Sequence, residues 1–201
     1  MKVTETKRDK ASAKRRQHIL ETAVTCFLEN GYHQTGLREI AKRAGVSLGN
    51  LYNHFPGKHD ILAEIAAIER EEMAPILEML ARDAPAGETL TQFVDDYTAI
   101  LASPDVVILT LEITCEAMRK PDIAELFAES RAALEAALIM LIERGIKAGE
   151  LRAVPEVAET AHLLIDLIEG GAYRIAIEEV PKKRVLENLK ALVTASLINT
   201  G

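Results

Sequence analysis

The sequence contains no stretch of eighteen apolar residues, and this absence predicts that no helix crosses a membrane. The N-terminus is basic but has no apolar segment behind the basic residues, so no secretory signal is expected. Only two cysteines occur, Cys26 and Cys115, and both lie within helical apolar patterns. Such cysteines are typical of buried thiols in a reducing cytosol and not of a disulfide. We therefore expect a cytoplasmic protein.

Motifs that would indicate catalysis are also missing. There is no glycine-rich phosphate loop, no Gly-x-Ser-x-Gly and no His-Glu-x-x-His. Helical carboxylate bundles bind two metal ions through paired Glu-x-x-His motifs, and only one match exists, from Glu159 to His162. We therefore expect neither an enzyme nor a metal or cofactor site.

Strand patterns are absent as well, because no period-two run enriched in β-branched residues occurs. Hydrophobic residues make up 48% of the 201 residues, which is enough for a sizeable core. Helices are expected to begin at Pro104, Pro121, Pro155 and Pro181. Pro75, in contrast, lies well inside a helical pattern and predicts a kink or break near residues 71–74. The predicted fold class is all-α.

The net charge of −7 is unevenly distributed along the chain. Residues 1–60 contain 11 lysines and arginines against 6 aspartates and glutamates, a net of +5, whereas residues 61–201 contain 13 against 25, a net of −12. This asymmetry is typical of a small DNA-binding domain joined to an acidic body. The basic residues near the N-terminus predict a disordered arm leading into a helix from residue 13, either as a solubilising tail or as a DNA contact.

Two short helices joined by a tight turn are predicted over residues 37–55. Apolar residues recur on one helix face at Leu37, Ile40, Ala41 and Ala44. Gly45 can adopt the positive φ that follows many helix ends, and the Ser47 hydroxyl is suited to cap the next helix. One side of that helix would be buried through Val46, Leu51 and Phe55. The arrangement predicts a helix-turn-helix whose second helix enters a DNA major groove.

An ordinary pair of antiparallel helices could show the same spacing, so the exposed face of the second helix decides between the two interpretations. No acidic residue occurs from residue 47 to residue 59, whereas a solvated helix face usually mixes glutamate and lysine. This favours DNA binding. The candidate contacts on the exposed face are Ser47, Leu48, Gly49, Asn50, Asn53 and His54.

Residues 16–62 resemble the N-terminal domain of the TetR family of transcriptional regulators. The matching positions are Ile19, Leu20, Ala23, Phe27, Gly31, Tyr32, Thr35, Ile40, Ala41, Ala44, Gly45, Val46, Ser47, Gly49, Leu51, Tyr52, Phe55, Pro56 and Lys58. The resemblance implies a three-helix DNA-binding domain, residues 1–57, and a larger helical domain for effector binding and dimerisation, residues 58–201. Residues 113–171 are similar to the effector domain of the choline-responsive repressor branch.

The resemblance also implies roles for single residues. Tyr52 and Lys58 would contact DNA phosphates. Thr35 and Gly36, at the start of the first helix of the motif, complete the candidate DNA contacts, although Gly36 stands where the family usually has threonine or serine. Asn50 also departs from the common residues, so the resemblance does not imply an operator sequence.

A pocket among the helices of the second domain is expected, but the residues leave its ligand open. A mostly apolar cavity needs a few polar groups that orient its ligand. The candidate lining residues are Val107, Leu111, Cys115 and Met118 on one helix face, together with Tyr97, Thr114, Arg131, His162 and Asp166. Each could instead be an ordinary residue of the surface or the edge of the core.

The predicted helices after Pro155 and Pro181 carry apolar faces that are either interior or a subunit interface. Gly170 and Gly171 would permit close approach of these helices. Reading a palindromic site requires two copies of the chain, so we predict a homodimer through these last two helices. The resemblance implies the same interface.

These observations predict a one-component transcriptional regulator. We expect a repressor that a small-molecule effector of unknown identity releases from palindromic double-stranded operator DNA. The helix that begins at Lys58 would link the pocket mechanically to the DNA-reading helices. Two alternatives stay open: a helical ligand-binding or enzymatic protein that no longer binds DNA, and an activator or a regulator without an effector.

Overall fold

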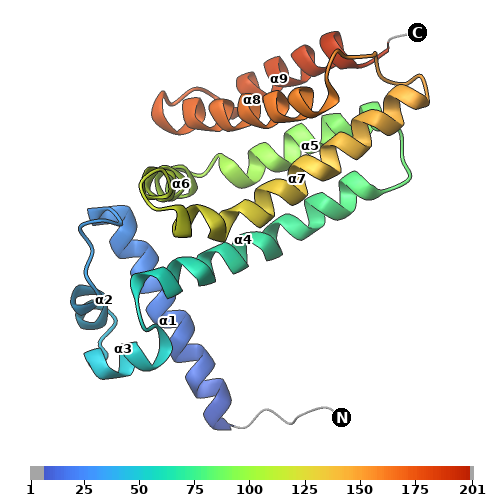
Figure 1. Ribbon diagram of the computed structural model, residues 1–201. Coiled ribbons are helices and arrows are strands. Elements are labelled where there is room, and N and C mark those ends of the chain that lie inside the picture. The colour runs from blue at the N-terminus through green and yellow to red at the C-terminus, as the bar shows by residue number, and fades with distance from the viewer. Residues whose placement is uncertain (1–6, 200–201) are drawn as a thin grey trace, which may run out of the picture. The chain divides into compact units, whose positions relative to one another are not determined.

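The computed structural model describes residues 7–199, and the regular elements among them are all helices (Figure 1). In chain order these are α1 (Lys7–Asn30), α2 (Leu37–Arg43), α3 (Leu48–His54), α4 (Lys58–Ala81), α5 (Ala86–Leu101), α6 (Pro104–Ala117), α7 (Pro121–Lys147), α8 (Val157–Ile177) and α9 (Lys182–Leu197). The predicted all-α fold is confirmed. The first six residues of the predicted basic arm lie outside the described residues.

Contacts between residues divide the chain into two compact units. Unit 1 contains Met1–Ala67 with Ile108–Leu126, and unit 2 contains Ile68–Val107 with Phe127–Gly201. Helices α4, α6 and α7 therefore contribute residues to both units. The predicted domain boundary after residue 57 stays a prediction.

Helices α2 and α3 form the predicted helix-turn-helix in unit 1. At the end of α2, the Val46 N–H donates to the Ala41 carbonyl at 3.0 Å, and the Gly45 N–H donates to the Lys42 carbonyl at 3.3 Å. This pair of bonds requires a left-handed residue after the helix, and Gly45 supplies it with a φ of 65°. The turn therefore has the local cause that the sequence indicated.

The two helices of this motif are fixed from behind by α1. Ile19 and Phe27 of α1 are fully buried, as are Ile40 of α2 and Leu51 of α3. Burying each such side chain contributes about 1.5–3 kcal/mol relative to exposure. This shared core orients α3 within unit 1.

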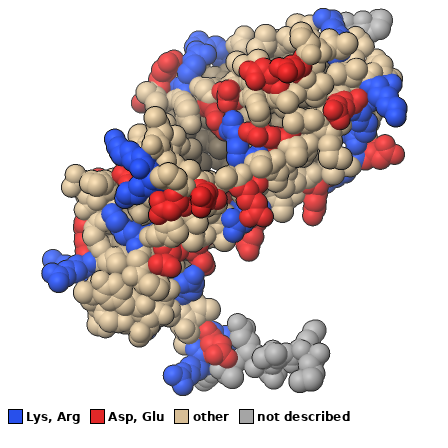
Figure 2. Space-filling model, viewed as in Figure 1, with Lys and Arg blue, Asp and Glu red and all other residues tan. Residues whose placement is uncertain are grey.

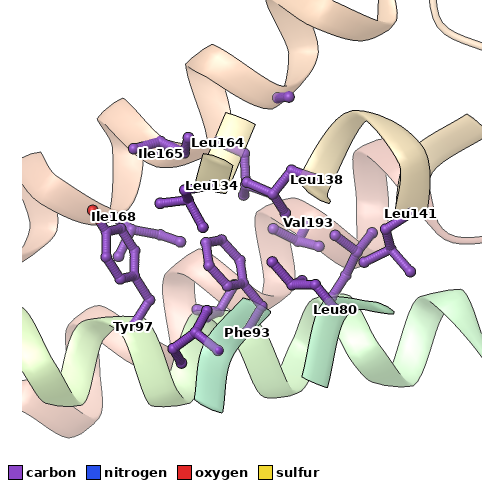
Figure 3. Close-up of a cluster of buried hydrophobic side chains, with 14 of the residues drawn as sticks. Leu80, Phe93, Tyr97, Leu134, Leu138, Leu141, Leu164, Ile165, Ile168 and Val193 are labelled. Carbon is purple, nitrogen blue, oxygen red and sulfur yellow. The ribbon is translucent and has the colours of Figure 1, made fainter. Parts of the chain in front are cut away.

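Unit 2 has an aliphatic core around Phe93 of α5. Figure 3 shows Phe93 among side chains from α7, α8 and α9, with Leu134 and Val193 close to its ring. One turn further along α5, Tyr97 stacks on Phe93 with 5.3 Å between ring centroids. The core-facing side of α5 therefore includes a tyrosine, and its hydroxyl donates a hydrogen bond to Glu169.

Close packing of α8 against α9 depends on one of the two predicted glycines. A Cβ atom on Gly171 would lie 3.0 Å from Val185 and 3.2 Å from Leu189, so a larger residue would push the helices apart. Gly170 has no such neighbour within 4 Å. The prediction of close approach is therefore confirmed for Gly171 and wrong for Gly170.

Three local expectations need correction. Helix α1 begins at Lys7, six residues before the predicted start. Helix α4 continues through Pro75, so the predicted break does not occur, whereas the predicted kink stays a prediction. Proline removes one backbone hydrogen bond, but the buried neighbours Met73 and Ile76 hold this part of α4 in the unit 2 core. Cys115 is exposed, whereas Cys26 is buried as expected.

Within residues 7–199, no single helix is long and apolar enough to cross a membrane. One bent pair, α5 with α6, meets that criterion by length and composition only.

Candidate DNA-binding surface and effector site

The uncovered face of α3 carries most of the predicted DNA contacts. Leu51 points into the unit 1 core, while Gly49, Tyr52 and Asn53 are exposed on the other side of the helix. Tyr52 keeps 48% of its surface accessible. Helix α3 contains no Lys, Arg, Asp or Glu, and the visible surface over it in Figure 2 is correspondingly tan. A helix face of this kind can approach base edges without the free-energy cost of removing a charged side chain from water.

The start of α3 is capped as predicted. The Ser47 hydroxyl accepts a hydrogen bond from the Asn50 N–H at 3.1 Å. The Asn50 side chain is half-buried, and its Oδ1 has no hydrogen-bond partner among the described residues. This oxygen is buried, and leaving it unpaired is costly. Leu48 and His54 are also half-buried on this helix.

Thr35 is placed differently from its prediction as a DNA contact. The residue is 1% exposed, and its hydroxyl donates to the carbonyls of Cys26 at 3.1 Å and Gly31 at 2.8 Å. The side chain therefore closes the loop between α1 and α2 and does not face solvent. Gly36 is exposed and forms the N-cap of α2 without a side-chain bond.

Lys58, the first residue of α4, is already engaged within unit 1. Its Nζ donates to the Tyr32 carbonyl at 2.7 Å and to the His33 carbonyl at 3.3 Å, and it lies 4.4 Å from the centroid of the Tyr32 ring. Burial lowers the pKa of Lys58, and the nearby Lys120 acts in the same direction. An ammonium group has three donors, so one donor remains for solvent or a DNA phosphate.

Arg16 of α1 holds the end of the DNA-reading helix, a role that the sequence did not reveal. One guanidinium nitrogen donates to the His54 carbonyl at 2.8 Å, and another pairs with Glu64 of α4 at 2.5 Å. The guanidinium also lies 4.2 Å from the centroid of the Phe55 ring. A cation at the C-terminus of a helix is favourable, so Arg16 both neutralises and anchors the end of α3. In the sequence, Arg16 was indistinguishable from the other basic residues of the arm.

A network of polar side chains lies in unit 2, where several residues of the predicted pocket meet. Arg131 of α7 donates to Glu135 at 2.9 Å, to Asp166 at 3.1 Å and to Glu169 at 2.6 Å. The Tyr97 hydroxyl donates to the same Glu169 at 3.2 Å. The predicted residues Tyr97, Arg131 and Asp166 are therefore brought together. Glu135 and Glu169, which join them, were not predicted.

His162, the fourth polar candidate of unit 2, joins the network through a carboxylate. Its Nε2 lies 3.3 Å from Glu135, and its Nδ1 lies 3.9 Å from Glu159. The two residues of the Glu-x-x-His match thus lie on one helix, and their side chains make only a long contact. Among residues 7–199, no group of three or more His, Cys, Asp or Glu side chains could hold a metal ion.

Two half-buried carboxylates of unit 2 have shifted pKa values. Burial raises the pKa of Glu169, opposed mainly by the neighbouring Arg131. Burial raises the pKa of Glu69 as well, again opposed by a nearby arginine, Arg70. Burial and the adjacent Glu169 carboxylate raise the pKa of Tyr97 far above its ordinary value, so its hydroxyl remains a donor. The network thus contains more half-buried acidic groups than cations.

The predicted apolar side of the pocket is not enclosed in this structure. Val107 is buried, but Leu111 and Cys115 are exposed, as is Thr114. Met118 is 83% exposed. A groove of about 500 Å³ in unit 2 lies elsewhere, and its lining includes none of the predicted pocket residues. The groove residues are Pro85, Gly87, Glu88, Thr91, Gln92, Asp95, Glu150, Ile198 and Asn199.

Comparison with known protein families agrees with this geometry. Residues 19–65 match the family described as bacterial regulatory proteins of the tetR family. Residues 85–197, more than half of the chain, match the C-terminal domain of BetI-type transcriptional repressors. The chain belongs to the TetR family. It is accordingly a helix-turn-helix transcriptional regulator, and the resemblance stated from its sequence is confirmed.

Individual TetR-family relatives span nearly the whole chain. An HTH-type transcriptional repressor of Mycobacterium tuberculosis is 30% identical over 173 residues, which cover 85% of this chain and 87% of the relative. A regulator of Saccharomonospora viridis, solved in complex with choline, is 25% identical with a TM-score of 0.79 over 93% of this chain and 99% of that chain. FadR of Bacillus subtilis, solved with stearoyl-CoA, is 25% identical with a TM-score of 0.71 over 87% and 97%.

Proposed function

We propose that this TetR-family regulator represses transcription as a homodimer, with each copy inserting α3 into the major groove of one operator half-site. The observation that carries this proposal is α3 itself. The helix is capped by Ser47, is fixed by a buried core and by Arg16, and contains no lysine, arginine, aspartate or glutamate. A rigid helix with short polar side chains is what direct reading of base edges requires.

Asn50 and Asn53 are proposed to read bases, because a carboxamide can pair with both hydrogen-bonding atoms of adenine. Leu48, Gly49 and His54 complete the base-facing side of α3, Leu48 through apolar contact. The phosphate contacts are assigned to Ser47, Gly36, Tyr52 and Lys58. The Tyr52 hydroxyl projects from the exposed side of α3, and Lys58 keeps one donor beyond the two that Tyr32 and His33 occupy.

The dimer is proposed to form through α8 and α9. Leu163 and Leu167 of α8 are 53% and 44% exposed, and Leu192 of α9 is 47% exposed. Ile177 at the end of α8 is exposed as well. Large aliphatic side chains grouped on two neighbouring helices mark an interaction surface on a monomer. A second copy with the same faces would cover them and give the two-fold symmetry of a palindromic site.

The effector is proposed to bind in the helical domain beside the network of Arg131, Tyr97 and Glu169. Polar groups held in place on α5, α7 and α8 can orient a ligand, and the neighbouring apolar side chains can shield that ligand from water. Two relatives were solved with choline and with stearoyl-CoA, molecules of very different chemistry, so their ligands do not indicate one effector for this chain. Release from DNA requires only that the effector binds one state of the dimer better than the other. The regulator would act in the cytoplasm and carry out no reaction.

Selection of genomic DNA by the purified chain tests the proposal. Bound fragments should share two inverted half-sites whose centres are one helical turn, about 34–36 Å, or a multiple apart. Tyr52→Phe is a matched variant, because it keeps the ring and loses only the hydroxyl proposed to contact a phosphate. It should select the same sequence with weaker affinity. Bound fragments without any shared sequence would contradict the proposal.

A further inference from the structure

The loop between α1 and α2 is held by α6, a helix that the sequence did not connect with DNA reading. Glu112 of α6 accepts a hydrogen bond from the Tyr32 backbone N–H, with 2.9 Å between its Oε2 and the nitrogen. Both residues belong to unit 1. A bond to a carboxylate is shorter and stronger than one between neutral groups, so this contact restrains the loop firmly.

Gly31 lets the carboxylate of Glu112 approach the loop. Its φ is 80°, a left-handed conformation that side chains rarely adopt. A Cβ atom at this position would lie only 3.2 Å from Oε2 of Glu112. The positive φ and the short distance to the Glu112 carboxylate therefore both favour glycine at position 31.

Glu116, one turn further along α6, faces the next residue of the same loop. It is 3% exposed, and its Oε1 lies 3.5 Å from Nδ1 of His33. Lys120 lies 3.1 Å from its Oε2, and Arg119 lies 3.6 Å from its Oε1. Burial by itself raises the pKa of Glu116, but Lys120, His33 and Arg119 together bring it below its ordinary value. Helix α6 thus contacts two successive residues of the loop through carboxylates.

Tyr32 is the residue at which three helices meet. Its N–H is bound by Glu112 of α6, and its carbonyl is bound by Lys58 of α4. Its ring is buried and packs edge-on against Phe27 of α1, with 5.1 Å between ring centroids. Burial raises the pKa of Tyr32 to about 12. A shift of the unit 1 part of α6 would therefore displace the loop that leads into α2.

We infer that Glu112 and Glu116 are positioning residues for DNA reading, because they fix the loop that leads into α2 and thereby orient α2 and α3. The inference rests on the proposed function and adds α6 to the elements that set operator affinity. Helix α6 begins in unit 2, at residues 104–107, and continues into unit 1.

Four single variants of the full chain test the inference. Glu112→Ala removes the acceptor, and Glu112→Asp keeps the charge but withdraws the carboxylate from the Tyr32 N–H by one methylene. Glu112→Gln keeps an acceptor of the same length without the charge. Glu125→Ala, an exposed position of α7 in unit 1, is the control for loss of one acidic charge. Each variant is titrated with its selected operator and with a scrambled fragment of the same length.

We expect Glu112→Ala and Glu112→Asp to bind the operator about tenfold more weakly, which corresponds to ~1.4 kcal/mol. Affinity for scrambled DNA and the salt dependence should stay unchanged, since Glu112 contacts no phosphate. Hydrogen exchange at the Tyr32 amide should become faster in both variants, because the bond that protects it is lost. Glu112→Gln keeps a weaker, neutral acceptor, so its operator affinity and its Tyr32 exchange rate should lie between those of wild type and Glu112→Ala.

Wild-type operator affinity in Glu112→Ala and Glu112→Asp would overturn the inference, and so would equal weakening by Glu125→Ala. Tighter operator binding would overturn it too, because the contact would then belong to the released state. All of these results leave the proposed function standing. A wild-type chain that selects no operator would instead overturn the proposed function and this inference together. If Glu112→Ala does not fold, the operator affinity and the Tyr32 hydrogen exchange of Glu112→Asp test the inference.

Discussion

Replacing Lys58 with methionine removes an ammonium group and keeps a side chain of similar length. In the wild type, Nζ donates to the carbonyls of Tyr32 and His33 and lies 4.4 Å from the centroid of the Tyr32 ring. Hydrogen bonds from a charged group contribute about 1.5–3 kcal/mol, and a partly exposed cation–π contact adds about 0.5–1 kcal/mol. Because the freed carbonyls can bind water, we expect the free energy of unfolding to decrease by about 2 kcal/mol.

The same substitution should also change how DNA binding depends on salt. If the third donor of Lys58 reaches a phosphate, the slope of log affinity against log salt should become shallower by about 0.9. Urea unfolding followed by circular dichroism measures the first effect, and operator titrations at several salt concentrations measure the second. Lys147→Met is the control, because it removes the same charge from an exposed position of unit 2.

The two results are independent. A Lys58→Met chain with the wild-type free energy of unfolding would refute the role of Lys58 in holding the loop. Reduced stability with an unchanged salt slope would refute the phosphate contact and leave that role intact. A loss of sequence preference with an unchanged salt slope would contradict the phosphate contact. It would agree with the role in holding the loop, because that loop leads into α2.

Three further predictions concern other parts of the molecule. Asn50→Ala and Asn53→Ala should each weaken discrimination at one base pair by about 1–3 kcal/mol without changing the salt slope. An unchanged selected sequence would place base reading elsewhere. Leu167→Glu combined with Leu192→Glu should yield monomers or insoluble protein in sedimentation experiments, and a folded dimeric double variant would move the interface. Burial raises the pKa of Glu69, so the folded chain binds this proton more strongly than the unfolded chain, and stability decreases as pH rises above the ordinary glutamate range. Glu69→Gln should therefore raise the free energy of unfolding at about pH 7. Between about pH 5 and pH 7 the stability of this variant should fall less than that of the wild type, as urea unfolding at several pH values would show. An unchanged pH profile would contradict this prediction.

The helix-turn-helix could be predicted because its determinants are local. Gly45 follows a helix and adopts the left-handed conformation, and the Ser47 hydroxyl caps the next helix three residues from its partner. Both features depend on residues within one turn. Thr35 shows the limit of such reasoning, because whether a hydroxyl near a helix start faces solvent or a carbonyl depends on the path of the preceding loop.

The unit 2 network was only partly predictable. Tyr97 and Arg131 stand out in the sequence as polar groups within apolar patterns, but Glu135 and Glu169 look like ordinary residues of a solvated helix face. Their role depends on how α5, α7 and α8 pack together. Sequence spacing describes one helix at a time and does not determine that packing.

The contact between Glu112 and Tyr32 could not be predicted at all. The two residues are 80 positions apart, and no period or motif relates them. Pro75 illustrates the opposite case, in which a valid local rule was overridden. Packing of its buried neighbours in the unit 2 core outweighs the loss of one backbone hydrogen bond, so α4 continues.

The most direct test of the account is the ratio of two affinities of the purified chain. One is its affinity for the selected operator, and the other is its affinity for a scrambled fragment of equal length and composition at the same salt concentration. We predict a ratio of at least about 10³, with both affinities decreasing as salt increases. A ratio near one would contradict the claim that α3 reads a specific DNA sequence.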